Sequence, residues 1–147
     1  MNKLILFACS PGGHSIQSEI WARVFIGLEG FKVARIVCNG KVNKENRILI
    51  KDFNITNFWL LIPSLVKILY ILQKEKPAIV ISTGAAPGFV FILASYILGI
   101  KSVWIDSIAN SKKISLSGRM AKPFTDKFFV QWPNLAQGKA EFIGSLI

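Results

Sequence analysis

The sequence predicts an α/β fold with a doubly wound, Rossmann-like parallel sheet. Short apolar runs of strand length alternate with stretches of helical periodicity along the whole chain. The runs at 4–9 and 78–82 are almost wholly apolar, as in strands that are buried on both faces of a parallel sheet. Loops rich in Gly, Ser and Pro follow the runs, at the carboxyl ends of the strands, where doubly wound sheets bind their ligands. We therefore expect function at that edge of the sheet.

Apolar runs and their Gly or Pro boundaries define the elements of the first half. A strand is predicted at 3–9, a helix at 15–28 with Gly30 as its cap, a strand at 31–38, a basic loop or short helix at 41–51, a short strand at 53–58 and a helix at 64–76. The last helix has a wide apolar arc that includes Val66 and Tyr70. That helix is either sandwiched inside the protein or lies on lipid headgroups.

The second half alternates in the same way. Strands are predicted at 78–82, 101–105 and 126–131, an apolar helix at 89–98 capped by Gly99, a polar and basic stretch at 110–123, and a short edge strand at 142–144. Pro87 suits the first turn of the apolar helix, because a first-turn N–H has no partner within the helix. Neither an internal repeat nor a linker is found, so residues 1–147 are expected to form one domain.

Composition departs from that of an ordinary soluble domain in two ways. The chain is 52% hydrophobic, with 11 Phe and 4 Trp, which indicates either an unusually apolar core or apolar surface kept for a partner or a membrane. Its formal net charge is +10, from 18 basic and 8 acidic residues, and predicts a negatively charged partner. Nucleic acid is disfavoured, because the sequence holds no basic recognition helix and its aromatic residues fall mostly in predicted core elements. Anionic lipid and phosphorylated substrates remain as the candidate negatively charged partners.

The cysteines and the apolar stretches bear on cellular location. Cys9 and Cys38 each end a predicted strand and are expected to be buried thiols, since the N-terminus is not a secretory signal. The two most apolar stretches, 58–72 and 89–98, are interrupted or too short to cross a bilayer, which takes about 20 residues. We expect a cytoplasmic protein, with attachment to a membrane surface left open.

The loop Ser10-Pro11-Gly12-Gly13-His14 joins the first strand to the first helix. Its Gly residues leave backbone N–H groups accessible, and the helix N-terminus adds its positive dipole, which suits a phosphate or another anion. His14, the sole histidine, can donate, accept or carry a proton there. The loop lacks the Lys of a Walker loop and the third Gly of a dinucleotide fingerprint, so a nicotinamide oxidoreductase is disfavoured.

Two further loops fall on the same predicted edge. Residues 83–88 form a second Gly-rich loop, which favours ligand binding over a simple turn. Residues 107–122 contain no acid and four Ser; they form either a phosphate site or a solvated basic loop, with Lys112, Lys113, Arg119 and Lys122 as the cations. Asp106, at a strand end, is expected to brace a loop. A single His and no Cys pair at ligand spacing predict no metal site, and no nucleophilic triad is found.

Five motifs occur in order along nearly the whole chain: Ser10-Pro11-Gly12-Gly13-His14, Ser82-Thr83-Gly84-Ala85-Ala86-Pro87-Gly88, Ile105-Asp106-Ser107-Ile108-Ala109, Ser115-Leu116-Ser117-Gly118 and Phe129-Val130-Gln131-Trp132-Pro133. Together they resemble the Alg-fourteen family of oligosaccharide biosynthesis proteins, including its bacterial capsule and exopolysaccharide members of the PssD/EpsE type. Many members carry Arg where this chain has Asn110, so no basic role is assigned at that position, although Lys112 and Lys113 are near.

The resemblance implies half of an enzyme: the acceptor-side, N-terminal-type domain of a GT-B glycosyltransferase, similar to the N-terminal half of MurG. A separate subunit of the Alg-thirteen type would hold the UDP-sugar. The pair would extend a lipid-diphosphate-linked acceptor at the inner face of the cell membrane, in capsule or exopolysaccharide synthesis, without a cofactor. The apolar segment 142–147 would be either a docking segment for the partner or an edge strand.

The loops and the resemblance together give one catalytic residue and a set of binding residues. His14 would act as a base or position the acceptor hydroxyl. The residues expected to bind substrate are Ser10, Gly12, Gly13, Thr83, Gly84, Ala85, Pro87, Gly88, Ser107, Asn110, Ser115 and Ser117. The alternative is a non-catalytic scaffold that recruits and activates a catalytic glycosyltransferase subunit at the membrane.

Overall fold

Six parallel strands form one sheet in the order β2-β1-β3-β4-β5-β6. The computed structural model describes residues 3–38 and 55–145. The strands are β1 (Lys3–Cys9), β2 (Phe31–Val37), β3 (Ile79–Ser82), β4 (Lys101–Ile105), β5 (Lys127–Val130) and β6 (Ala140–Phe142). The predicted α/β fold with a parallel sheet is confirmed.

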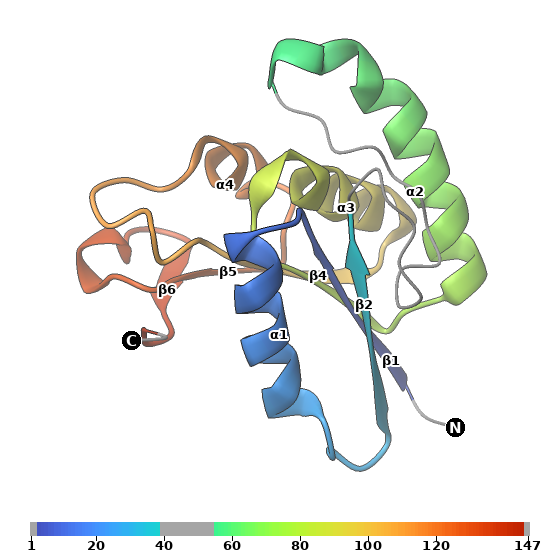
Figure 1. The fold of residues 1–147 in the computed structure, drawn as a ribbon, viewed down its shortest axis with the longest axis horizontal. Helices are drawn as coiled ribbons and strands as arrows, with labels where there is room; N and C mark the ends of the chain where they lie inside the picture. Colours follow the sequence, from blue (N-terminus) through green and yellow to red (C-terminus); the bar gives the residue numbers. More distant parts are fainter. Residues whose placement is uncertain (1–2, 39–54, 146–147) are drawn as a thin grey trace.

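Helices cover both faces of the sheet. They are α1 (Gly13–Phe25), α2 (Leu61–Glu75), α3 (Ala85–Leu98) and α4 (Leu116–Ala121), with 3-10 turns η1 (Ile55–Leu60) and η2 (Pro133–Leu135). Figure 1 shows α1 on one face and α2, α3 and α4 on the other. Strand side chains alternate accordingly: Leu6 and Ala8 pack in the core under α2 and α3, whereas Ile5 and Phe7 pack against α1.

The larger core lies between the sheet and α3, which is apolar on nearly every side because α2 and α4 cover it as well. Trp104 of β4 and Phe128 of β5 are fully buried there, with stacked rings whose centroids are 6.4 Å apart. Truncation of such a side chain to Ala costs about 3–5 kcal/mol. This core holds the carboxyl ends of β3 and β4 in place.

The opposite face is only partly covered, since α1 packs mainly on β1 and β2. A groove of about 400 Å³ runs beside α1, over β3, β4 and β5. Its lining is hydrophobic throughout and includes Trp21, Val24, Ile81, Ile105, Phe129 and Ile143. All-parallel sheets normally have both faces covered by helices, so this groove is an unusual apolar surface.

Several predicted boundaries moved. Helix α1 starts at Gly13 because Gly12, with φ +83°, caps it, and it ends at Phe25 rather than Leu28. The predicted cap Gly30 lies instead in the turn before β2, and Gly27 takes the left-handed conformation just after the helix. Helix α3 begins at Ala85 rather than Phe89, so the second Gly-rich loop is partly helical. Gly99 caps it as predicted, with φ +66°.

Four predictions need correction or fall at least partly outside the described residues. Residues 55–58 are not a strand, because they form the 3-10 turn that leads directly into α2; residues 41–51, 53 and 54 lie outside the described residues. The stretch 110–123 contains the unpredicted helix α4. The edge strand is present as β6, two residues earlier than predicted.

Helix α2 is not sandwiched inside the protein. Ser64, Ile68 and Leu72 are buried, whereas Val66 is 63% exposed and Tyr70 is 66% exposed. Cys9 and Cys38 are buried free thiols, as predicted. Across residues 3–38 and 55–145, no helix has both the length and the hydropathy that a bilayer crossing requires.

Candidate functional site

The order of the strands creates a crevice between the carboxyl ends of β1 and β3. These strands are neighbours in the sheet, but the chain leaves β1 toward α1 on one face and β3 toward α3 on the other (Figure 1). Such a switch point is where doubly wound sheets bind ligands. The two Gly-rich loops of the sequence, 10–14 and 83–88, therefore meet at one place.

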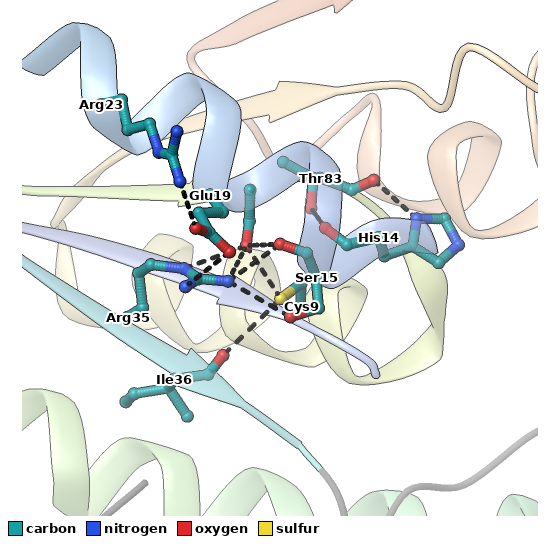
Figure 2. Close-up of polar contacts among 9 residues, drawn as sticks. Cys9, His14, Ser15, Glu19, Arg23, Arg35, Ile36 and Thr83 are labelled. Carbon is teal, nitrogen blue, oxygen red and sulfur yellow. Dashed lines mark hydrogen bonds and ion pairs between the residues drawn. The ribbon is translucent and has the colours of Figure 1, made fainter. Parts of the chain in front are cut away.

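His14 and Thr83 join the two loops directly. His14 Nδ1 lies 2.8 Å from the Thr83 carbonyl oxygen, and Thr83 Oγ1 donates a 2.8 Å hydrogen bond to the His14 carbonyl oxygen (Figure 2). Gly84 lies against the imidazole so closely that a Cβ there would be 2.5 Å from two ring atoms. Thr83 is fully buried, and His14 is half-buried. His14 is thus held by the second loop.

Helices α1 and α3 both begin at this crevice. Their cap residues are Gly12 and Gly84, and neither helix has a side-chain cap or an acidic residue in its first turn. The first N–H groups of a helix have no partner within it and carry the positive end of the dipole. Gly12 and Gly13 have open space where a Cβ would point. The arrangement can accept an anion.

A cationic side chain lies beneath the first turn of α1. Figure 2 shows Arg35 reaching from β2, where its guanidinium donates to the Ser15 carbonyl oxygen at 2.8 Å and to the Ser15 and Ser18 hydroxyls at 3.2 Å. The Glu19 carboxylate lies 3.7 Å away. Arg35 therefore fixes the turn that carries the Gly-rich loop.

Two groups beside Arg35 have shifted pKa values. Burial raises the pKa of the Cys9 thiol, and the hydrogen bond to Ser18 and the charge of Arg35 offset this only in part. The hydrogen bond from Arg23 lowers the pKa of the Glu19 carboxyl, with the charge of Arg35 adding to the effect. Cys9 is therefore a neutral thiol and Glu19 a carboxylate at neutral pH.

A buried amide network links α1 to the loops after β4 and β5. Gln17 Nε2 donates to Ser107 Oγ at 3.2 Å, and Gln131 Nε2 donates to Gln17 Oε1 at 3.2 Å and to the Asp106 carbonyl oxygen at 3.0 Å. All four residues are at least nine-tenths buried. The network fixes α1 relative to the two loops at the edge of the sheet.

Asp106 braces the third loop, as predicted. Its carboxylate accepts hydrogen bonds from Trp104 Nε1 at 3.0 Å and from the N–H and hydroxyl of Ser115. Ser115 in turn caps α4 by accepting a bond from the Gly118 N–H at 2.9 Å. A Cβ on Gly118 would lie 2.6 Å from the Asp106 carboxylate, so the fit is close.

The remaining predicted site residues occupy different surroundings. Ser10 is buried at the end of β1, and Pro87 and Gly88 are buried in the first turn of α3. Asn110 is half-buried, and its N–H donates to the Ser107 carbonyl oxygen at 3.0 Å. Ser117 is half-buried in α4, and Ala85 is half-buried with φ +65°. Direct contacts join His14, Thr83 and Gly84, whereas Ser115 contacts the Asp106 brace instead.

Sequence reasoning missed Arg35, Gln17 and Ser18. Arg35 carried a usable signal, because a charge in the middle of an apolar strand needs a partner. Gln17 and Ser18 lie on the buried side of α1, and one amphipathic turn gives no indication of which polar residue turns inward. Gln131 lies in the motif Phe129-Val130-Gln131-Trp132-Pro133, but its hydrogen bond to Gln17 of α1 joins residues 114 positions apart.

The model of the family "Oligosaccharide biosynthesis protein Alg14 like" matches residues 47–146, which is more than half of the chain. The chain is similar to the UDP-N-acetylglucosamine transferase subunit ALG14 of Yarrowia lipolytica, with 32% identity over 85 residues that cover 52% of this chain and 39% of the relative. The chain is also similar to the UDP-N-acetylglucosamine transferase subunit alg14 of Schizosaccharomyces pombe, with 35% identity over 96 residues that cover 60% of this chain and 45% of the relative. The match thus spans less than half the length of these relatives.

Solved structures show the same fold at low identity. Acinetobacter baumannii MurG superimposes with a TM-score of 0.79 at 12% identity, covering 97% of this chain and 45% of that one. UDP-GlcNAc 2-epimerase of Methanocaldococcus jannaschii superimposes with a TM-score of 0.68 at 15% identity, covering 86% of this chain and 39% of that one. The fold is therefore Rossmann-like and of the GT-B type. With the family match across β3 to β6, this chain belongs to the Alg14-like family of oligosaccharide biosynthesis proteins.

Proposed function

We propose that this chain is the acceptor-binding, membrane-associating subunit of a two-component UDP-sugar glycosyltransferase. A donor-binding subunit of the Alg-thirteen type forms the other wall of the active-site cleft. The acceptor is a lipid-diphosphate-linked sugar at the inner face of the cell membrane, and the product belongs to capsule or exopolysaccharide synthesis. The names of the relatives make UDP-N-acetylglucosamine the first donor to test.

The observation that carries the proposal is the placement of His14 in the crevice between β1 and β3. The ring is held by Thr83 and lies against Gly84, so it has one orientation. It stands beside two helix N-termini that have no side-chain cap, and such N-termini favour negative charge. A proton acceptor next to an anion site is what transfer from a sugar diphosphate to a hydroxyl requires.

The reaction uses these groups in one displacement. The acceptor hydroxyl oxygen bonds to C1 of the donor sugar while the bond from C1 to the UDP oxygen breaks, and that electron pair leaves with UDP. The hydroxyl proton passes to His14. The N–H groups of Gly12 and Gly13 stabilise a diphosphate, and Ser107, Asn110 and the basic loop with Lys112 and Lys113 bind the acceptor phosphates.

The apolar groove beside α1 supports binding of a partner subunit. Its lining continues into Ile143 of the C-terminal segment, which was a candidate docking segment. A second copy of this chain is a poor occupant, because each copy carries a net charge of +10 and the two repel. We assign the groove to an apolar surface of the donor-binding subunit.

The outer face of α2 supports attachment to a membrane. Ile62, Val66 and Tyr70 follow one another at helical spacing on α2, Trp59 lies just before them in η1, and each of the four is more than 60% exposed. Lys67 and Lys74 are exposed on the same helix. Aromatic and aliphatic side chains flanked by lysines are typical of helices that lie on anionic lipid.

Sugar transfer from radiolabelled UDP-sugars to a membrane lipid-linked acceptor tests the proposal. The assay is run with this chain, with the donor-binding candidate, and with both. Transfer only by the mixture, and its loss by at least about 100-fold in His14→Ala, is the expected result. Glu75→Ala, an exposed change at the end of α2, is the control. Transfer by the candidate alone, or full activity of His14→Ala in the mixture, favours the scaffold alternative.

A further inference from the structure

The imidazole of His14 has two nitrogens with different surroundings. Nδ1 lies 2.8 Å from the carbonyl oxygen of Thr83, and a carbonyl oxygen can only accept a hydrogen bond. Nδ1 must therefore carry the hydrogen. In the neutral ring the lone pair then lies on Nε2, which points away from Thr83 in Figure 2 and makes no hydrogen bond within the described residues.

Three further features hold His14 and its ring in this orientation. The Thr83 hydroxyl donates to the His14 carbonyl oxygen at 2.8 Å, so the same two residues are joined by a second bond in the opposite sense. Thr83 is fully buried at the end of β3, which fixes the position of its carbonyl. The Cα of Gly84 closes the side of the ring, where even one methyl group would be 2.5 Å from Cε1 and Nδ1.

We infer that Thr83 and Gly84 lock His14 in the Nδ1–H tautomer, so that Nε2 is the atom that takes the acceptor's proton. Thr83 is a positioning residue, since it acts through His14. In the transfer, Nε2 gains the hydroxyl proton and the ring becomes an imidazolium whose Nδ1–H still donates to Thr83. The proton returns to water after product release. The tautomer is a property of the protein itself, whereas its use in catalysis rests on the proposed function.

The tautomer can be measured without any activity, because the chain has a single histidine. Long-range ¹H–¹⁵N NMR of protein labelled at histidine gives one set of ring signals, which needs no assignment. At a pH where the ring is neutral, we expect a protonated Nδ1 and an unprotonated Nε2. Free histidine favours the opposite tautomer, so an Nε2–H spectrum in the wild-type protein overturns the inference.

Two variants and a matched control test the lock. Gly84→Ala, which displaces the ring, and Thr83→Val, which removes the hydroxyl and keeps the shape, are expected to populate the Nε2–H form. Thr83→Ser keeps the hydroxyl and is expected to retain the wild-type spectrum. If Gly84→Ala fails to fold, the comparison of the tautomers in Thr83→Val and Thr83→Ser still tests the lock. An unchanged spectrum in Thr83→Val would overturn the role of the Thr83 hydroxyl in holding the Nδ1–H tautomer.

In the two-subunit transfer assay, Thr83→Val is expected to lower kcat by about 10- to 100-fold with little change in KM for the UDP-sugar, and Thr83→Ser to recover most of it. A rise in KM with unchanged kcat overturns the positioning role. An Nδ1–H spectrum without any transfer by the mixture leaves the lock standing and counts against the proposed function alone.

Discussion

The carboxylate of Asp106 accepts hydrogen bonds from both the backbone N–H and the hydroxyl of Ser115, at 3.0 and 2.6 Å. This pair ties the carboxyl end of β4 to the cap of α4. Asp106 is only 1% exposed, so its carboxyl oxygens are satisfied by hydrogen bonds within the protein rather than by water. The basic loop between the two residues therefore has both of its ends fixed.

Asp106→Asn is expected to destabilise the fold by about 2–4 kcal/mol, because an amide NH₂ would replace one accepting oxygen and face a donor. The free energy of urea unfolding measures the loss. Glu29→Gln, a charge change at an exposed residue, is the control and should stay within about 0.5 kcal/mol of the wild type. Equal stability of the two variants would show that Asp106 does not brace the loop.

Cys9 gives the fold a dependence on alkaline pH. Burial raises its pKa in the folded state, so above about pH 8.5 the unfolded chain loses the thiol proton while the folded chain keeps it. Its contribution to stability is complete below that pH and is lost as the pH rises through the folded pKa. Comparing urea unfolding of the wild type and Cys9→Ala between pH 7 and pH 10 should show a steeper fall for the wild type. Parallel curves would contradict this.

The outer face of α2 is expected to hold the protein on anionic lipid. Val66→Asp places a charge in that face and should lower binding to phosphatidylglycerol vesicles by at least about tenfold, with binding measured by co-sedimentation. Val24→Asp on α1 is a matched control, since Val24 and Val66 are each 63% exposed. Equal losses for both variants would mean that binding follows net charge alone.

For binding of the donor-binding subunit, the two variants Val24→Asp and Val66→Asp are expected to exchange roles. Val24 lines the groove, so Val24→Asp should weaken association with the donor-binding subunit in gel filtration of the mixture, whereas Val66→Asp should not. Both side chains are exposed in this chain, so neither change is expected to disturb its own folding. Retained association in Val24→Asp would exclude the groove as the partner's surface.

The sheet was predictable from sequence because its strands are marked by apolar runs with sharp ends. Lys3–Cys9 and Lys101–Ile105 were predicted to the residue, since Gly, Ser or Asp follows each run within a few positions. Helix α4 was missed because its six residues are too few to show a period of 3.6. The only local sign of it was Ser115, a typical helix cap.

The loops of the candidate site were placed on the correct edge, but their contacts were not predictable. The bond between His14 and Thr83 joins residues 69 positions apart, and it depends on the order of strands in the sheet, which apolar runs do not encode. The closeness of Gly84 to the ring depends on the same order. Arg35 was identifiable as unusual, but its partners on α1 became visible only when β2 was paired with β1.

The hydrophobic groove and the net charge of +10 have opposite effects on association between copies of this chain: the groove favours it and the charge disfavours it. Charge repulsion between copies acts over about 10 Å at 0.1 M salt but only about 3 Å at 1 M, whereas contact between apolar grooves does not weaken with salt. Without its partner the protein should therefore be most soluble at low ionic strength and precipitate as salt is added. The salt concentration of the buffer therefore decides whether the purified protein is monomeric or aggregated. Light scattering across a series of salt concentrations measures the change.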